Sequence, residues 1–311
     1  MSFNRDDRRT LIATGFGLVA ILLWSTLAAL AAYLSAVPPF QLVAMSFALS
    51  TLVGVFWSAA SGERLADLKT VPWRFWLLGF YGLFGYHAAY FFAFQSAPAV
   101  EANLINYLWP VLIVAFSTLL PRDLGGTRLR WWHVVGSVLG FSGVAIILLQ
   151  SAPAHFDARS SAAGYAAALA AALIWSSYSV ASRLFAAVPS LAVMVTSAIT
   201  AMAAAGVSAA TETWVWPSGA SPMLALAFQG LGPVGLAFYV WDRAMKHGHV
   251  RAVGILSYLT PLLSTAMLIV TGGGQASPML WIAALLITAG AVVGSSDVWA
   301  RGNSDATGER A

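Results

Sequence analysis

The chain contains no cysteine and very little charge. Without cysteine, disulfides, thiolate catalysis and cysteine-ligated metals are excluded. Only 9% of the 311 residues are charged and 59% are hydrophobic, with a mean hydropathy of +0.77. A soluble domain has about 25% charged residues, so a water-soluble globule does not fit this composition. The composition predicts a membrane protein that crosses the lipid bilayer several times.

Several function motifs are also missing. The chain has no phosphate-binding Walker loop, no dinucleotide fingerprint and no HExxH sequence. His247 and His249 stand close together, but no third metal ligand is evident, so we expect neither a metal nor a cofactor. The net charge is +4, yet its Lys and Arg are scattered without a basic face or run, so we expect no nucleic-acid partner.

Long apolar segments fill most of the chain. Lipid offers no partner for unpaired backbone groups, so segments that cross a membrane in this pattern are expected to be helices. The length suffices for about ten spans of roughly 20 residues. The sequence therefore predicts an all-α polytopic protein with ten transmembrane helices, near residues 11–34, 40–60, 73–95, 99–120, 131–150, 162–186, 190–210, 222–246, 250–271 and 279–299.

The first apolar run follows Arg5, Arg8 and Arg9, as in a signal peptide. It is too long for a signal sequence and has a counterpart in the middle of the chain, so it is predicted to be the first span. With the N-terminus in the cytoplasm, every Lys and Arg except Arg159 falls on a cytoplasmic segment. This bias predicts that both termini are cytoplasmic.

The sequence repeats itself at a spacing of 151 residues. Segment 22–39 aligns without a gap with segment 173–190, and the same spacing relates later pairs: Trp24 and Trp175, Tyr90 and Trp241, Tyr107 and Tyr258, Pro110 and Pro261. Each half holds five predicted spans, an odd number, so the second half must enter the membrane from the opposite side. We expect a first repeat at 1–150, an inverted second repeat at 151–300 and a cytoplasmic tail at 301–311, with a substrate cavity between the halves.

Three features carry a resemblance to a known family. They are the Trp-Ser pair in the first and sixth spans, the segments SAPAVEANLINYLWP and HGHVRAVGILSYLTP, and the Gly-rich fifth span. The chain resembles EamA-type members of the drug/metabolite transporter superfamily, and its aromatic pattern is similar to the YddG-type aromatic amino acid exporters of bacterial inner membranes. The resemblance implies ten helices around a central cavity with alternating access.

Aromatic and polar residues gather in the third and fourth spans and in their repeat. Tyr86 and Tyr90 are four residues apart and share a helix face, with His87 on its flank. Such residues either line a cavity or belong to the packing and the aromatic belts. Their depth and repeat partners favour a cavity, and the candidate substrate-binding residues are Trp24, Tyr86, His87, Tyr90, Asn103, Asn106, Tyr107, Trp109, Trp175, Tyr178, Tyr239, Trp241 and Tyr258.

His87 is a titratable residue within a predicted span, which points to function. It could bind a substrate carboxylate, carry a proton, or be satisfied by a neighbouring Ser or Tyr. Pro110 and Pro261 each remove a backbone donor and free the carbonyl four residues earlier. These prolines could act as hinges, bind a substrate ammonium, or simply kink the helix for packing.

The substrate class follows from the missing charges. No Lys or Arg lies in the middle of a predicted span, and Asp242 and Arg243 lie near span ends, where snorkelling or loop pairing explains them. A phosphorylated substrate would need such cations. We therefore expect a small-molecule exporter of aromatic and apolar amino acids, with a multidrug or other metabolite exporter of the same fold as the alternative.

An enzyme is the competing hypothesis from another class. Residues 140–143 read Gly-Phe-Ser-Gly, which fits the GxSG pattern of rhomboid intramembrane proteases, and His87 could be offered as the partner of Ser142. Small residues also suit close packing between helices. The packing interpretation is favoured, and no catalytic residue is predicted.

Overall fold

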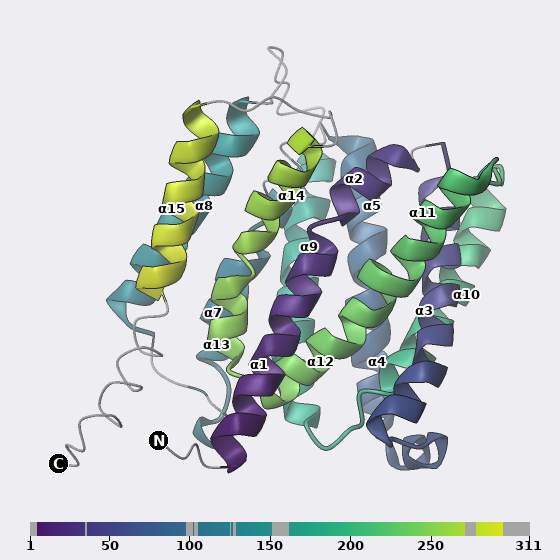
Figure 1. Ribbon diagram of the computed structural model, residues 1–311, viewed down its shortest axis with the longest axis horizontal. Helices are drawn as coiled ribbons and strands as arrows, with labels where there is room; N and C mark the ends of the chain where they lie inside the picture. Colours follow the sequence, from purple (N-terminus) through teal and green to yellow (C-terminus); the bar gives the residue numbers. More distant parts are fainter. Residues whose placement is uncertain are drawn as a thin grey trace.

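The computed structural model describes residues 5–34, 36–97, 102, 105–124, 126, 129–150, 162–270 and 278–294 (Figure 1). All regular structure within these ranges is helical, which confirms the all-α prediction for them. Four helices are long and apolar enough to cross a membrane: Pro39–Ser61, Ala162–Phe185, Ala192–Thr211 and Ala220–His247. The fold is that of a multi-pass membrane protein.

The helices of the first half follow the predicted spans, several of them in two pieces. They are α1 (Arg5–Trp24), α2 (Leu27–Tyr33), α3 (Pro39–Ser61), α4 (Trp73–Phe80), α5 (Tyr86–Ser96), α7 (Trp109–Ser117) and α8 (Trp131–Gln150). Short 3-10 turns lie at Leu65–Thr70 and Arg122–Leu124. Asn103, one of the candidate binding residues, lies outside the described residues.

The second half has a matching set. Its helices are α9 (Ala162–Ala181), α10 (Ala192–Thr211), α11 (Ala220–Leu231), α12 (Ala237–His247), α13 (Val250–Leu256), α14 (Leu259–Val270) and α15 (Pro278–Gly294). A 3-10 turn at Ser182–Phe185 continues α9. The described helices of each half thus appear in the same order.

Two π-helical turns interrupt the helices at equivalent places. One joins α4 to α5 at Tyr81–Gly85, and the other joins α11 to α12 at Gly232–Leu236. Their first residues, 81 and 232, differ by the spacing of 151 found in the sequence. A π turn moves the backbone hydrogen bonds out of the α register, and such turns often mark functional sites. The sequence repeat is therefore also a repeat of backbone irregularities.

Both candidate hinge prolines lie in the first turn of a helix that begins after a break. Pro110 follows the first residue of α7, and Pro261 lies near the start of α14, just after α13 has ended at Leu256. The Ser176 hydroxyl lies 2.9 Å from the Trp109 carbonyl oxygen at the first of these breaks. The sequence located these interruptions correctly, and the hinge role stays a prediction.

Helices of the two halves pack against each other in matched pairs. α3 packs along α10 and α8 packs along α15, so two spans contact their own counterparts. α1 packs along α12, and α9, the counterpart of α1, packs along α5, the counterpart of α12. The helices therefore form one bundle in which exchanging the halves preserves the main contacts (Figure 1).

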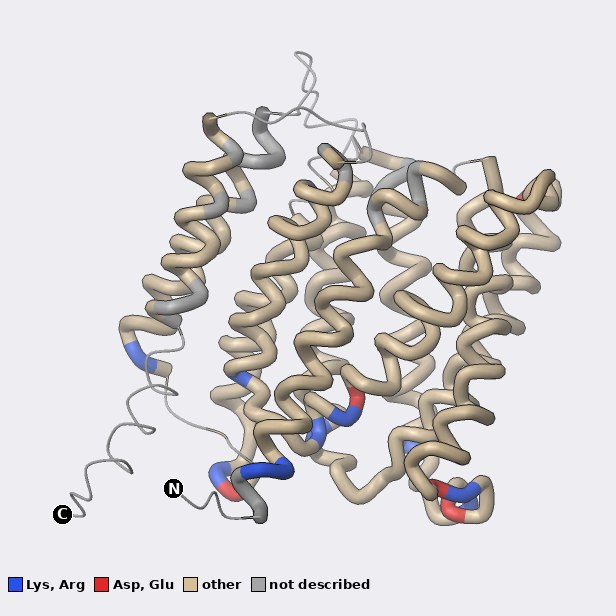
Figure 2. The backbone as a smooth tube through the Cα atoms, in the orientation of Figure 1, with Lys and Arg blue, Asp and Glu red and all other residues tan. Residues whose placement is uncertain are grey.

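Lys and Arg residues of the described chain gather toward one end of the bundle (Figure 2). There Glu63 accepts hydrogen bonds from the backbone N–H of Leu191 at 2.8 Å and from Arg243 at 3.2 Å, and so ties the two halves together. Asp242 differs from our expectation. It neither snorkels nor pairs with a loop, because its carboxylate lies 2.8 Å from Lys246 Nζ on the same helix and both side chains are fully buried.

The Gly-Phe-Ser-Gly segment of α8 serves close packing. A Cβ added at Gly143 would lie 2.7 Å from the carbonyl oxygen of Ala283 on α15, and one at Gly140 would lie 2.8 Å from the Tyr258 ring. Only glycine allows such an approach of the helix backbones. The spacing that fits a protease motif is therefore explained by helix packing.

We expect Gly143→Ala to destabilise the protein by about 1–3 kcal/mol, since the added methyl group overpacks the α8–α15 contact. Thermal unfolding in detergent, followed by size-exclusion chromatography, measures the effect. Gly206→Ala is the matched control, because a Cβ at Gly206 on α10 would meet no atom within 4 Å. Equal melting temperatures for both variants would contradict the packing interpretation.

Candidate functional site

A cavity of about 200 Å³ lies in the centre of the bundle, between the two halves. Both halves line it, through α1 to α3, α5 and α7 from the first and α9, α11, α12 and α14 from the second. Most lining side chains are aromatic or aliphatic. The lining residues are Trp24, Leu27, Leu42, Val43, Ser46, Phe47, Tyr86, His87, Tyr90, Phe91, Asn106, Tyr107, Trp109, Trp175, Gln229, Pro233, Val234, Phe238, Thr260 and Ser264.

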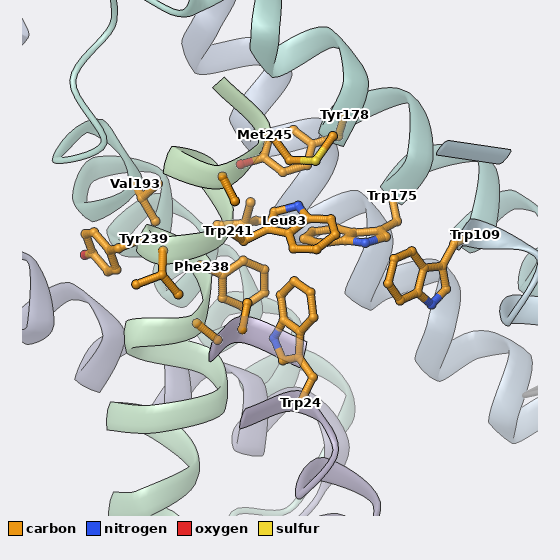
Figure 3. Close-up of a cluster of buried hydrophobic side chains, with 14 of the residues drawn as sticks. Trp24, Leu83, Trp109, Trp175, Tyr178, Val193, Phe238, Tyr239, Trp241 and Met245 are labelled. Carbon is orange, nitrogen blue, oxygen red and sulfur yellow. The ribbon is translucent and has the colours of Figure 1, made fainter. Parts of the chain in front are cut away.

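Four tryptophans from both halves form a cluster on the side of the cavity that faces the charged end. The Trp24 ring centroid lies 5.3 Å from that of Trp175 and 4.8 Å from that of Trp241, and Trp109 meets Trp24 edge-on at 6.4 Å (Figure 3). Trp241 itself is buried and does not line the cavity. On α12 it is followed by Met245 and Lys246, so along this helix it lies between the cavity-lining Phe238 and the basic last turn.

Two of the four indole N–H groups in this cluster have hydrogen-bond partners. The Trp24 indole donates to the Pro233 carbonyl at 2.9 Å, across the boundary between the halves, and Trp241 donates to the Ser179 hydroxyl at 3.1 Å. Pro233 belongs to the π turn of the second half. Since an unpaired buried N–H is costly, these bonds fix how the rings are turned.

His87 is held by the π turn of the first half. Its Nδ1 lies 2.7 Å from the carbonyl oxygen of Leu83, which is also approached by the Tyr86 backbone N–H. The imidazole ring lies edge-to-face against Phe47 and Tyr86, both at 5.0 Å between ring centroids. A backbone carbonyl therefore satisfies one ring nitrogen, where the sequence had suggested a Ser or Tyr.

The polar groups of the cavity are neutral. Asn106 donates to the Tyr86 hydroxyl over a long 3.4 Å, and Gln229 donates to the Ser46 hydroxyl at 3.1 Å. The carbonyl oxygens of both amides and the Thr260 hydroxyl have no partner among the described residues, although they are buried. Among the described residues, no Lys, Arg, Asp or Glu lines the cavity. Unpaired buried polar atoms of this kind call for an explanation, and a bound ligand is one.

The structure brings most of the candidate binding residues together. Those that line the cavity are Trp24, Tyr86, His87, Tyr90, Asn106, Tyr107, Trp109 and Trp175. Four others are buried elsewhere. Tyr178 packs against Gly82, and Trp241 belongs to the tryptophan cluster. The Tyr239 ring points away from the tryptophans (Figure 3), and its hydroxyl donates to the Ser50 carbonyl at 2.9 Å. Tyr258 packs with Ala283 and Ile287.

Sequence reasoning missed several lining residues. Phe238 is the repeat counterpart of His87 at the spacing of 151, and this relation alone could have placed it. Gln229 is a polar residue inside an apolar span, and this feature of the sequence could have marked it as a cavity residue. Ser46 and Ser264 carry no comparable signal, because serine is common in membrane helices as a packing residue.

A helical bundle that crosses the membrane and encloses a cavity between two similar halves defines a membrane transporter. Residues 11–149 and 162–295 match the model of the EamA-like transporter family, and the chain belongs to that family. This membership confirms the predicted family and places the chain among transporters rather than enzymes. The pair of matched segments corresponds to the two halves of the fold.

The relatives include named exporters. A protein of Ancylobacter novellus called "Aromatic amino acid exporter YddG" is 47% identical over 281 residues, covering 90% of this chain and 96% of its own. The protein of the same name from Salmonella typhimurium is 26% identical over 299 residues, again covering 90% and 96%. A crystal structure with 47% identity superposes with a TM-score of 0.84 over 91% of this chain and 96% of that one.

Proposed function

We propose that the protein exports aromatic and other apolar amino acids across the bacterial inner membrane. This proposal rests on the cavity, whose walls are largely aromatic. The polar groups of its lining are neutral, and some of them have no hydrogen-bond partner among the described residues. Ring faces and edges favour an aromatic or apolar side chain. The names of the relatives point to the same substrate class.

The lining also explains which substrates are disfavoured. A phosphate or a second carboxylate would need a cation in a site of low polarity, and the described residues of the lining include none. A zwitterionic amino acid has no net charge, and its two ends can be met by hydroxyl, amide and imidazole groups. Among the candidate binding residues, those on the cavity wall are the ones we propose to contact it directly.

Alternating access would come from rocking two inverted repeats of five helices against each other. The matched helix contacts and the two equivalent π turns support this two-fold arrangement. Pro110 and Pro261 would act as the hinges, because each lies where a helix is interrupted. The tryptophan cluster would close the cavity toward the charged end, which is the side we assign to the cytoplasm, because Trp241 lies between Phe238 and the basic last turn of α12.

Purified protein in liposomes should exchange radiolabelled phenylalanine, tryptophan or methionine in a counterflow assay. We expect Val43→Trp to lower this flux about ten-fold or more, since Val43 lines the cavity and an indole would fill it. Val55→Trp, on the same helix but 62% exposed, is the matched control and should exchange normally. Both variants are checked for a monodisperse elution profile.

Two results would count against this proposal. Flux no greater than in empty liposomes for all three amino acids would remove the substrate class. Unchanged flux in Val43→Trp would show that the substrate does not pass through this cavity. A wider panel of apolar drugs and metabolites in the same assay separates an amino acid exporter from a multidrug exporter.

The orientation can be tested because the chain has no cysteine of its own. Thr70 lies in an exposed loop at the charged end, and Thr213 lies in an exposed loop between α10 and α11. In intact cells with a permeabilised outer membrane, we expect an impermeant maleimide to label Thr213→Cys and not Thr70→Cys. The reverse pattern would overturn the cytoplasmic assignment of the charged end and of both termini.

A further inference from the structure

The hydrogen bond of His87 determines which of its nitrogens carries the hydrogen. A carbonyl oxygen only accepts, so the contact of 2.7 Å between Nδ1 and the Leu83 oxygen requires a hydrogen on Nδ1. The π turn supplies this acceptor within the same helix, because its backbone bonds are out of the α register. The geometry selects the tautomer in which Nε2 keeps its lone pair.

The second nitrogen of His87, Nε2, belongs to a side chain that lines the cavity. Nε2 has no hydrogen-bond partner among the described residues. It is also not among the unpaired polar atoms that are fully buried. His87 lines the cavity and is partly exposed there. A second proton would place a cation among aromatic rings with no carboxylate in the lining, which is costly. The ring is therefore neutral and presents an acceptor.

We propose that His87 Nε2 accepts a hydrogen bond from the ammonium group of the transported amino acid, an inference that rests on the proposed function for its substrate. An ammonium has three donors and no acceptor, so it matches a lone pair, whereas a carboxylate would be repelled by it.

This assignment also orients the substrate. With the ammonium at His87 on α5, the carboxylate is left to neutral donors on other elements. Ser46 on α3 already accepts from Gln229, so its own hydrogen is free to be donated, and Ser264 on α14 offers a second hydroxyl. The aromatic side chain is then left to the tryptophan and tyrosine walls.

The two halves of the protein differ at this point. Phe238 occupies the position equivalent to His87, and its ring lies 6.2 Å from the imidazole, but it has no polar atom. In the second π turn the Pro233 carbonyl receives the Trp24 indole. Among the described residues that line the cavity, His87 is the one imidazole, and Phe is a natural replacement with which to remove it.

The first test uses competition in the counterflow assay. Phenylalaninamide keeps the ammonium and lacks the carboxylate, while 3-phenylpropionate keeps the carboxylate and lacks the ammonium. We expect His87→Phe to weaken competition by phenylalaninamide about ten-fold or more and to leave that by 3-phenylpropionate unchanged. His87→Gln, which can present an amide oxygen near the Nε2 position, should restore most of the loss. Selective loss of 3-phenylpropionate competition would overturn the proposal.

The second test needs no transport. With ¹⁵N-labelled histidine in nanodiscs, the chain shows five imidazoles, and the His87 signals are those absent from His87→Phe. We expect Nδ1 protonated and Nε2 unprotonated, with the Nε2 signal shifted by phenylalaninamide and not by 3-phenylpropionate. A hydrogen on Nε2, or no response to phenylalaninamide, would overturn the proposal. If the wild type shows no counterflow of any amino acid, that result would instead count against the proposed function.

Discussion

The structure depends on where backbone hydrogen bonds are satisfied inside an apolar bundle. Lipid provides no partner for a freed carbonyl, so an interrupted helix survives in the membrane only where another group completes its bonding. Here side chains meet the carbonyls at the breaks: Leu83 receives an imidazole in addition to the Tyr86 N–H, and Pro233 receives an indole. The Trp109 carbonyl shares the Ser176 hydroxyl with the Ala172 carbonyl, at 2.9 and 2.6 Å. Each of these donors belongs to a side chain on or beside the cavity wall. The irregular backbone and the cavity are therefore parts of one arrangement.

The same bonds connect the two halves. Trp24 of the first half reaches the π turn of the second, and Ser176 of the second half reaches the broken helix of the first. Glu63 adds a further link at the charged end, through Arg243 and the backbone of Leu191. A movement of one half against the other must break or slide these contacts. These polar bonds form only at particular positions of one half against the other, so they favour defined conformations of the bundle. Apolar packing alone would resist sliding of the two halves only weakly.

Much of this was predictable from the sequence, because it rests on composition and spacing. The apolar segments located the helices, and the 151-residue spacing anticipated the equivalence of the two broken helices. The direction of individual side chains was less accessible: Tyr107 lines the cavity, while its counterpart Tyr258 is buried with Ala283 and Ile287, and the spacing of the repeat does not distinguish the two positions. The partner of His87 could not be predicted either, because a π turn changes which residues share a face.

We propose that one cavity between the halves binds the amino acid, with its ammonium at His87 and its side chain among the tryptophans and tyrosines. A structure of this chain in nanodiscs with L-tryptophan bound is the most direct test. We expect density for the ligand inside the cavity, with its amino nitrogen within about 3 Å of His87 Nε2. Density for the carboxylate at that nitrogen, or for the ligand at a site outside the cavity, would contradict it.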